Sequence, residues 1–89
     1  MEYEVKHDEE RHVFFIDTDG YRAYAEYVRT DSGLDIIHTI VPAEIGGRGI
    51  AALLVKTAYD YARQNGLKPV ATCAYAAVWL KRHPEYLAD

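Results

Sequence analysis

A glycine-dense turn, Gly46 to Gly49, constrains the fold of this chain more than any other feature. It separates an apolar run that ends at Val41-Pro42 from a long helical pattern that begins at Ile50. A chain with this order must place a strand, a tight turn and a helix N-terminus in direct succession. The bare N–H groups of such a turn, together with the unpaired N–H groups and positive dipole end of the helix, form a site for a phosphate or diphosphate group.

The residues before this turn alternate between apolar and polar. Tyr3 to His7, Val13 to Ile16 and Tyr21 to Arg29 each have a strand pattern, with turn-forming residues between the second and third. We expect these strands to form antiparallel hairpins. Leu34 to Val41 is nearly continuously apolar and predicts a central strand, which Pro42 stops because proline cannot donate to a ladder.

The second half of the chain predicts a strand between two helices. Apolar residues recur at three- and four-residue steps from Ile50, and Asn65-Gly66 supplies a helix stop. Lys68 to Thr72 suits a strand that a crossover places parallel to the run ending at Val41. Tyr75 to Arg82 reads as a short terminal helix. We therefore predict an α+β fold: a mixed, mostly antiparallel sheet of about five strands with a β-α-β crossover and a C-terminal helix.

Length, charge and cysteine content exclude several classes of protein. With 89 residues, the chain has room for one domain, over residues 1–89. Its net charge of −4, with scattered basic residues, argues against nucleic acid as a partner. A lone Cys excludes an intramolecular disulfide, and the N-terminus lacks the pattern of a signal peptide. No apolar run approaches the roughly 18 residues of a membrane span. We expect a cytoplasmic protein with no membrane partner.

Two well-known phosphate-binding loops do not fit the glycine turn. A P-loop requires Lys followed by Ser or Thr after its last glycine, and neither follows Gly49. Gly47, Gly49 and Ala52 satisfy the loose dinucleotide pattern, but a single crossover without an acidic residue near Lys68 cannot form the paired halves of that fold. A third interpretation, that the glycines only shape a tight loop, stays open.

Four ordered motifs instead resemble the GNAT superfamily of N-acetyltransferases. The resemblance covers most of the chain and is closest to the minimal branch of that superfamily, whose members have this length and lack the usual N-terminal helices. Four matches at compatible spacing are far more specific than any one alone. The motifs are His38-Thr39-Ile40-Val41-Pro42, Gly47-Arg48-Gly49-Ile50, Cys73-Ala74-Tyr75 and Arg82-His83-Pro84-Glu85-Tyr86.

The resemblance implies acetyl-coenzyme A as the acyl donor. It places the diphosphate at the turn and first helical residues, and the pantetheine arm between the splayed strands that precede and follow the helix. The superfamily usually has Arg or Gln at the first position of the loop, which is Gly46 here. We expect backbone donors, with Arg48 as a partial substitute, to retain binding. A backbone N–H near Ile40 or Val41 would hold the thioester carbonyl. The implied cofactor-binding residues are Ile40, Val41, Gly46, Gly47, Arg48, Gly49, Ile50 and Ala51.

Three side chains are candidates for catalysis. Cys73 stands where the acetyl group should arrive, just before the terminal helix, and a thiol there could act as a nucleophile or as a proton donor. His38, expected on the side of Ile36 and Ile40, could deprotonate the amine or pair with Cys73. The hydroxyl of Tyr75 is a second proton donor. Each has a structural alternative: a buried small Cys, a hydrogen-bonded strand His and a packing Tyr.

The function that these observations predict is transfer of acetyl from acetyl-coenzyme A to a primary amine. The alternative is a non-catalytic acyl-coenzyme A-binding or protein-interaction module, for which Gly46 is the hint in the sequence. No residue identifies the acceptor amine. The four His residues and Cys73 have no metal-ligand spacing, so we predict no metal.

Overall fold

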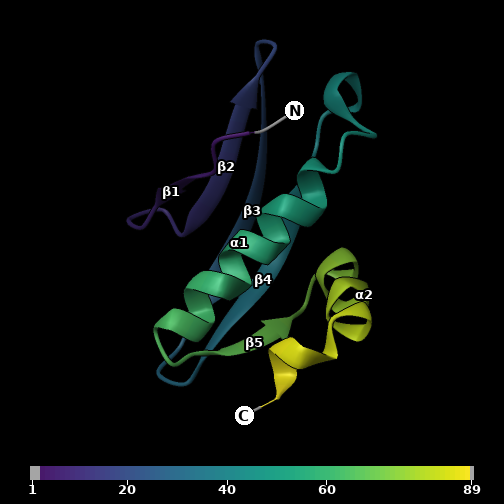
Figure 1. The fold of residues 1–89 in the computed structure, drawn as a ribbon. Coiled ribbons are helices and arrows are strands. Elements are labelled where there is room, and N and C mark those ends of the chain that lie inside the picture. The colour runs from purple at the N-terminus through teal and green to yellow at the C-terminus, as the bar shows by residue number, and fades with distance from the viewer. Residues whose placement is uncertain (1–2, 89) are drawn as a thin grey trace.

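The computed structural model describes residues 3–88 as a five-stranded sheet with helices packed against it (Figure 1). The strands follow the order β1-β2-β3-β4-β5 and are antiparallel, except that β5 is parallel to β4. The predicted α+β fold, with its β4-α1-β5 crossover, is confirmed. The elements are β1 (Lys6–Asp8), β2 (Val13–Thr18), β3 (Tyr21–Arg29), β4 (Gly33–Ile40), η1 (Ala43–Ile45), α1 (Ile50–Gln64), β5 (Lys68–Ala71), α2 (Ala74–Arg82) and η2 (Pro84–Leu87).

The main difference from the predicted elements lies at the N-terminal edge of the sheet. We expected a strand over Tyr3–His7, but only Lys6–Asp8 pairs with β2. Tyr3 and Val5 still pack against the core. Their alternation therefore reflects burial and not a backbone ladder. The short 3₁₀ helices η1 and η2 were not predicted, because segments of three or four residues have no apolar periodicity to detect.

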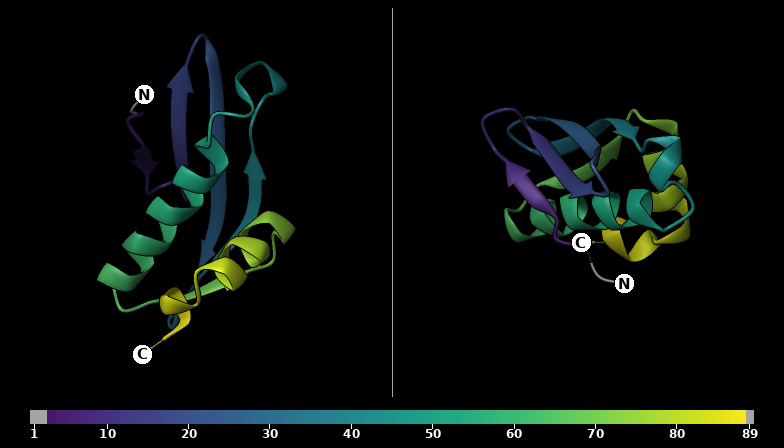
Figure 2. Two further views of the ribbon diagram at one scale, coloured as in Figure 1. Left: turned by 45° about the vertical axis from the view of Figure 1, so that its right-hand side comes forward. Right: turned by 90° about the horizontal axis from the view of Figure 1, so that it is seen from above.

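The core lies between one face of the sheet and α1, which contacts β2, β3, β4 and β5. As predicted, alternate residues of β3 turn to this face, where Ala23 and Ala25 are buried. Their small side chains allow the helix to approach the sheet closely. Seen from above, α1 runs along the lower side of the sheet and α2 stands at one end of it (Figure 2). The ring centroids of Trp79 in α2 and Tyr59 in α1 lie 5.9 Å apart. No helix among residues 3–88 is long and apolar enough to cross a bilayer.

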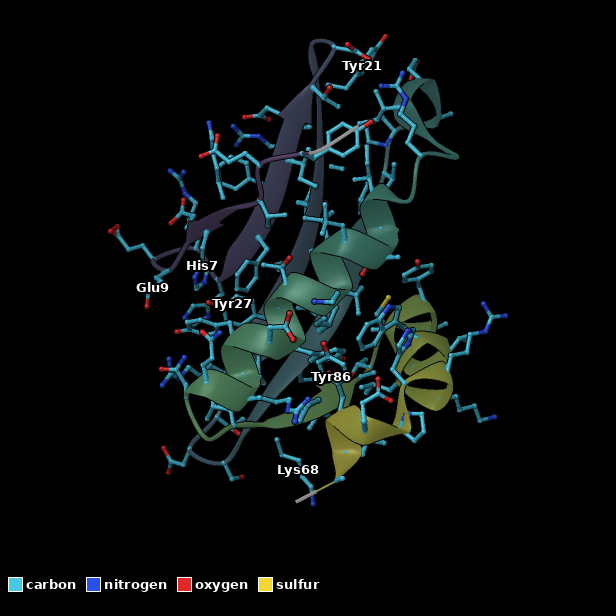
Figure 3. All side chains as sticks on the ribbon, viewed as in Figure 1. His7, Glu9, Tyr21, Tyr27, Lys68 and Tyr86 are labelled. Atoms are coloured by element: carbon cyan, nitrogen blue, oxygen red, sulfur yellow. The ribbon has the colours of Figure 1, made fainter. Side chains whose placement is uncertain are left out.

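A cluster of aromatic side chains packs the C-terminal half of α1 against strands β1, β2 and β3. The Nε2 atom of His7 lies 2.6 Å from the hydroxyl oxygen of Tyr27, and its ring stacks on Phe14 with centroids 3.9 Å apart. Tyr61 of α1 meets the same imidazole edge-on at 4.6 Å. Figure 3 shows His7 and Tyr27 on the same side of α1. Burial lowers the pKa of His7, against the opposing effect of nearby carboxylates, and raises the pKa of Tyr27 to about 12.

The lowered pKa of His7 predicts that the fold weakens in mild acid. Below the ordinary His pKa of 6.5, the unfolded chain takes up a proton that the folded chain resists, so the free energy of unfolding falls as pH falls through the lowered pKa. We expect this loss between pH 6.5 and the folded pKa in urea titrations of the wild type. His7→Phe, which retains a planar ring on Phe14, should flatten the curve. Parallel curves for the two proteins would contradict the assignment.

Candidate functional site

The glycine turn exposes its backbone where α1 begins. Gly47 has φ of 74° and Gly49 has φ of 80°, both in the left-handed region that glycine adopts without strain. A Cβ added at either position would meet no heavy atom within 4 Å. Gly49 is the N-cap residue of α1, and no side chain among residues 3–88 caps the helix. The backbone here therefore faces open space.

Three N–H groups at the start of α1 remain for an external acceptor. The first bond of the helix runs from the Leu53 N–H to the carbonyl of Gly49, at 3.1 Å, so the N–H groups of residues 50–52 precede it. A hollow of about 260 Å³ lies beside them. Of the predicted cofactor-binding residues, only Ile40 and Arg48 do not line it. The lining is Val41, Ile45, Gly46, Gly47, Gly49, Ile50, Ala51, Ala52 and Tyr75.

The side chain of Arg48 forms an ion pair with Asp19, so its charge is not free for a phosphate group. Its Nη1 atom lies 2.6 Å from an oxygen of Asp19, in the turn between β2 and β3. The carboxylate offsets the guanidinium charge and ties the glycine turn to the neighbouring hairpin. With glycine at position 46 as well, the turn presents backbone dipoles but no cationic side chain without a partner.

A β-bulge in β4 changes which side chains face the helices. Tyr27 pairs with Ile36, but the preceding residue of β3, Glu26, pairs with His38, which leaves Ile37 as the extra residue. The bulge inverts the alternation, so His38 lies opposite Glu26 on the face turned away from α1 and is exposed. The expectation that His38 shares a face with Ile36 and can pair with Cys73 is therefore wrong.

Thr39 takes the position that we expected for His38. It pairs with Ala25, a buried residue on the helix-facing side of β3. Its Oγ1 atom lies 3.6 Å from the sulfur of Cys73. Thr39 belongs to the motif His38 to Pro42, but strict alternation along β4 predicts that it faces away from α1. The contact between Thr39 and Cys73 follows only from the register between β3 and β4.

The backbone of Thr39 also faces the opening between β4 and β5. The N–H of Tyr27 donates to the carbonyl of His12, at 3.0 Å, so Tyr27 and, by alternation, Ala25 direct their backbone groups toward β2. Thr39 lies opposite Ala25, so its N–H points away from β3. It points to the edge of β4 beyond Ile36, where β5 no longer pairs with β4. By the same alternation Ile40 faces β3. Thr39, and not Ile40, therefore offers its N–H to the opening.

The junction between β5 and α2 is fixed by Asp35. Its two carboxylate oxygens accept bonds from the N–H and from the Oγ1 hydroxyl of Thr72, each at 2.7 Å. The N–H of the next residue, Cys73, donates to the carbonyl of Ile36 at 2.9 Å. These bonds set the point at which the chain leaves the sheet, and they place Cys73 at the N-cap of α2.

The surroundings of Cys73 favour its thiolate. Burial alone raises the pKa of this half-buried thiol, but the N–H groups of Ala76 and Tyr75 and both the hydroxyl and the N–H of Thr39 together hold the pKa below its ordinary value. The sulfur makes no capping bond of regular geometry. The lowering therefore comes from several nearby donors, including those at the start of α2. A thiol in this setting is ionised more readily than an ordinary Cys.

Tyr75 lies in the first turn of α2 and is 42% exposed. It lines the hollow beside the glycine turn together with Gly47 and Gly49. Its role as a proton donor stays a prediction.

Residues 3–88 contain no group of three His, Cys, Asp or Glu side chains placed to hold a metal ion.

The corrected geometry predicts that Thr39, and not His38, sets the reactivity of Cys73. Thr39→Val preserves the side-chain shape but removes the hydroxyl. Because a hydrogen bond contributes on the order of 1 kcal/mol, we expect alkylation by iodoacetamide at neutral pH to slow by roughly fivefold. His38→Gln is the matched control and should leave the rate unchanged. A slower rate in His38→Gln alone would restore the original pairing.

Comparison with known proteins gives a consistent result along the whole chain. The sequence model of the GCN5-related N-acetyl-transferase family matches residues 2–89. Protein NATD1 from Danio rerio is 38% identical over 89 residues, with 93% of this chain and 80% of the relative covered. Protein NATD1 from Homo sapiens is 37% identical over 84 residues, with 90% and 74% covered. The NMR structure of a GCN5-like protein from Staphylococcus aureus superposes with a TM-score of 0.72 at 34% identity, covering 93% of this chain and 82% of that one.

Proposed function

The chain belongs to the GCN5-related N-acetyltransferase family, and we propose that it binds acetyl-coenzyme A at the glycine turn and transfers the acetyl group to a primary amine. The observation that carries this proposal is the uncapped start of α1. Ile50, Ala51 and Ala52, which carry its free N–H groups, line one hollow together with Gly47 and Gly49, whose backbone no side chain covers. The N–H of Gly46 is not one of the free donors, because it bonds the carbonyl of Ala43 at 3.1 Å. This donor set suits the diphosphate of coenzyme A.

The other end of the proposed site lies where β4 and β5 separate. Acetyl-coenzyme A would supply an acetyl group that is already activated as a thioester. The N–H of Thr39 faces the opening and could stabilise negative charge on an oxygen there. Val41 and Tyr75 line the hollow between the glycine turn and this opening. A single groove would thus hold the diphosphate and direct the acetyl group toward Cys73.

Cys73 is the residue that we propose for catalysis. As a nucleophile, its sulfur would bond the acetyl carbon while the thioester bond breaks, and the amine would then displace it. As a proton donor, it would protonate the departing thiolate while the amine attacks directly. In either role the proton lost by Cys73 ends on the departing sulfur, and the amine proton restores the thiol. The lowered pKa of Cys73 favours the nucleophilic role.

The role that we propose for His38 is toward the acceptor amine only. It lies on the face of the sheet opposite to α1, beside Glu26. An amine that approached the opening from this face would meet its imidazole, a side chain of the kind that serves as a general base. This assignment needs no contact between His38 and Cys73.

Two measurements test the proposed function. At a concentration one hundred times its dissociation constant, acetyl-coenzyme A should stabilise the fold by about 2.7 kcal/mol, which is visible as a melting shift. Release of free coenzyme A thiol should then depend on an added amine, tested with a polyamine, a lysine side chain and a peptide N-terminus. Absence of both effects would remove the proposal.

One observation favours a second candidate, a non-catalytic acyl-coenzyme A-binding module. The turn has glycine at position 46, and Arg48 is paired with Asp19, so its hold on the diphosphate depends on backbone donors. A protein of this kind would show the melting shift with acetyl-coenzyme A but release no thiol with any amine. The two candidates are therefore separated by the second measurement alone.

A further inference from the structure

A second hollow continues the site along the helices. It has a volume of about 410 Å³ and lies between α1 and the α2-η2 corner. It shares Ala52 and Tyr75 with the hollow beside the glycine turn. The two spaces are therefore neighbours, one beside the N-terminus of α1 and the other reaching the last turn of α2. We refer to the second space, bounded by Lys56, Trp79 and Arg82, as the interhelical groove.

The interhelical groove presents two cationic side chains in a chain of net charge −4. Its lining contains Lys56 and Arg82 against one carboxylate, that of Glu85. The Lys56 ammonium lies 2.9 Å from Asp60, which also accepts a 2.6 Å bond from the hydroxyl of Tyr86. This network fixes the position of the ammonium. Arg82 forms no ion pair within residues 3–88, so its guanidinium is the cation left for a ligand.

The location of this free cation matters because the glycine turn has none. Position 46 is glycine, and the guanidinium of Arg48 is paired with the carboxylate of Asp19. Coenzyme A carries phosphate at two places, the diphosphate and the 3′-position of its ribose. From Ile50 to Lys56, α1 rises about 9 Å, a distance comparable to that across a nucleoside. The groove also offers apolar surface for an adenine ring, since Val78 is 48% exposed.

We propose that the interhelical groove binds the adenosine end of coenzyme A, and that Arg82 contacts the 3′-phosphate and supplies the charge missing from the turn. This inference rests on the proposed binding of acetyl-coenzyme A. Arg suits the role because its planar guanidinium forms charge-assisted bonds with phosphate oxygens. Recognition of the coenzyme in this chain then depends on backbone donors at one end of the groove and on a cationic side chain at the other.

The test compares acetyl-coenzyme A with acetyl-3′-dephospho-coenzyme A by isothermal titration calorimetry. The wild type should bind the dephosphorylated compound about fivefold more weakly, the upper range for a solvent-exposed ion pair. Arg82→Ala should weaken acetyl-coenzyme A by a similar factor and leave the dephosphorylated compound unaffected. Lys81→Ala is the matched control, because Lys81 is exposed on the same helical turn but does not line the groove. It should change neither affinity.

Four other results would overturn the inference, and one of them also tests the proposed function. Equal wild-type affinity for the two compounds, or an equal loss of both affinities in Arg82→Ala, would place the 3′-phosphate elsewhere while acetyl-coenzyme A binding stands. A change in the apparent affinity for the amine alone would assign the groove to the acceptor. If neither compound binds the wild type, the proposed function fails as well. Arg82→Gln, which retains the long side chain, repeats the test if Arg82→Ala folds poorly.

Discussion

Cys73→Ala is expected to slow amine-dependent acetyl transfer by at least about a hundredfold, the lower range for loss of a group that transfers protons or forms a covalent bond. Binding of acetyl-coenzyme A should be unchanged, because the thiol lies at the β5-α2 junction and outside the lining of both hollows. The fold should tolerate the change, since Cys73 is only half-buried. Thiol release and calorimetry measure the two effects separately.

Cys73→Ser and mass spectrometry distinguish the two roles of the thiol. Serine retains the shape and can donate a bond to Thr39, but its hydroxyl does not ionise near neutral pH. If Cys73 is a nucleophile, the wild type incubated with acetyl-coenzyme A and no amine should carry one acetyl group on this residue. Turnover in Cys73→Ala equal to that of the wild type would return Cys73 to a packing role.

Gly47→Asp is expected to weaken acetyl-coenzyme A binding by roughly thirtyfold, because it places a negative charge beside the donors that would receive a diphosphate. Gly47→Asn is the matched control. It has nearly the same shape, Asn tolerates the left-handed φ of 74° at this position, and a Cβ there meets no heavy atom within 4 Å. Calorimetry should find only a small loss for Asn, attributable to reduced access to the backbone.

The contrast between these two variants separates charge from geometry. Equal affinities for Asp and Asn, both near that of the wild type, would show that no anion binds next to Gly47. An equal and large loss in both would indicate that the turn needs glycine for its shape alone. Only a selective loss with Asp agrees with an anion site at the start of α1.

Local patterns in the sequence were sufficient for most of the fold. The three- and four-residue spacing from Ile50 and the stop at Asn65-Gly66 predicted α1, whose last helical residue is Gln64. The alternation over Tyr21 to Arg29 predicted a strand, and β3 spans these residues. These features succeed because an amphipathic periodicity and a helix end depend on neighbouring residues only.

The details of the candidate site depend on contacts between distant segments and could not be predicted in this way. The bulge at Ile37 arises from the register between β3 and β4, and it moves His38 to the outer face and Thr39 toward Cys73. The ion pair between Arg48 and Asp19 joins residues 29 positions apart. Strict alternation along a strand has no means to foresee an extra residue, so it reversed every assignment beyond the bulge.

Titration of the ¹⁵N-labelled protein with acetyl-coenzyme A tests most directly whether the glycine turn and the first turn of α1 receive a diphosphate. The account predicts saturable shifts of the backbone amide resonances of Gly47, Gly49, Ile50 and Ala51, which open onto the same hollow. Saturable shifts that leave these four amides unchanged, for example shifts confined to the outer face around Phe15, would contradict it.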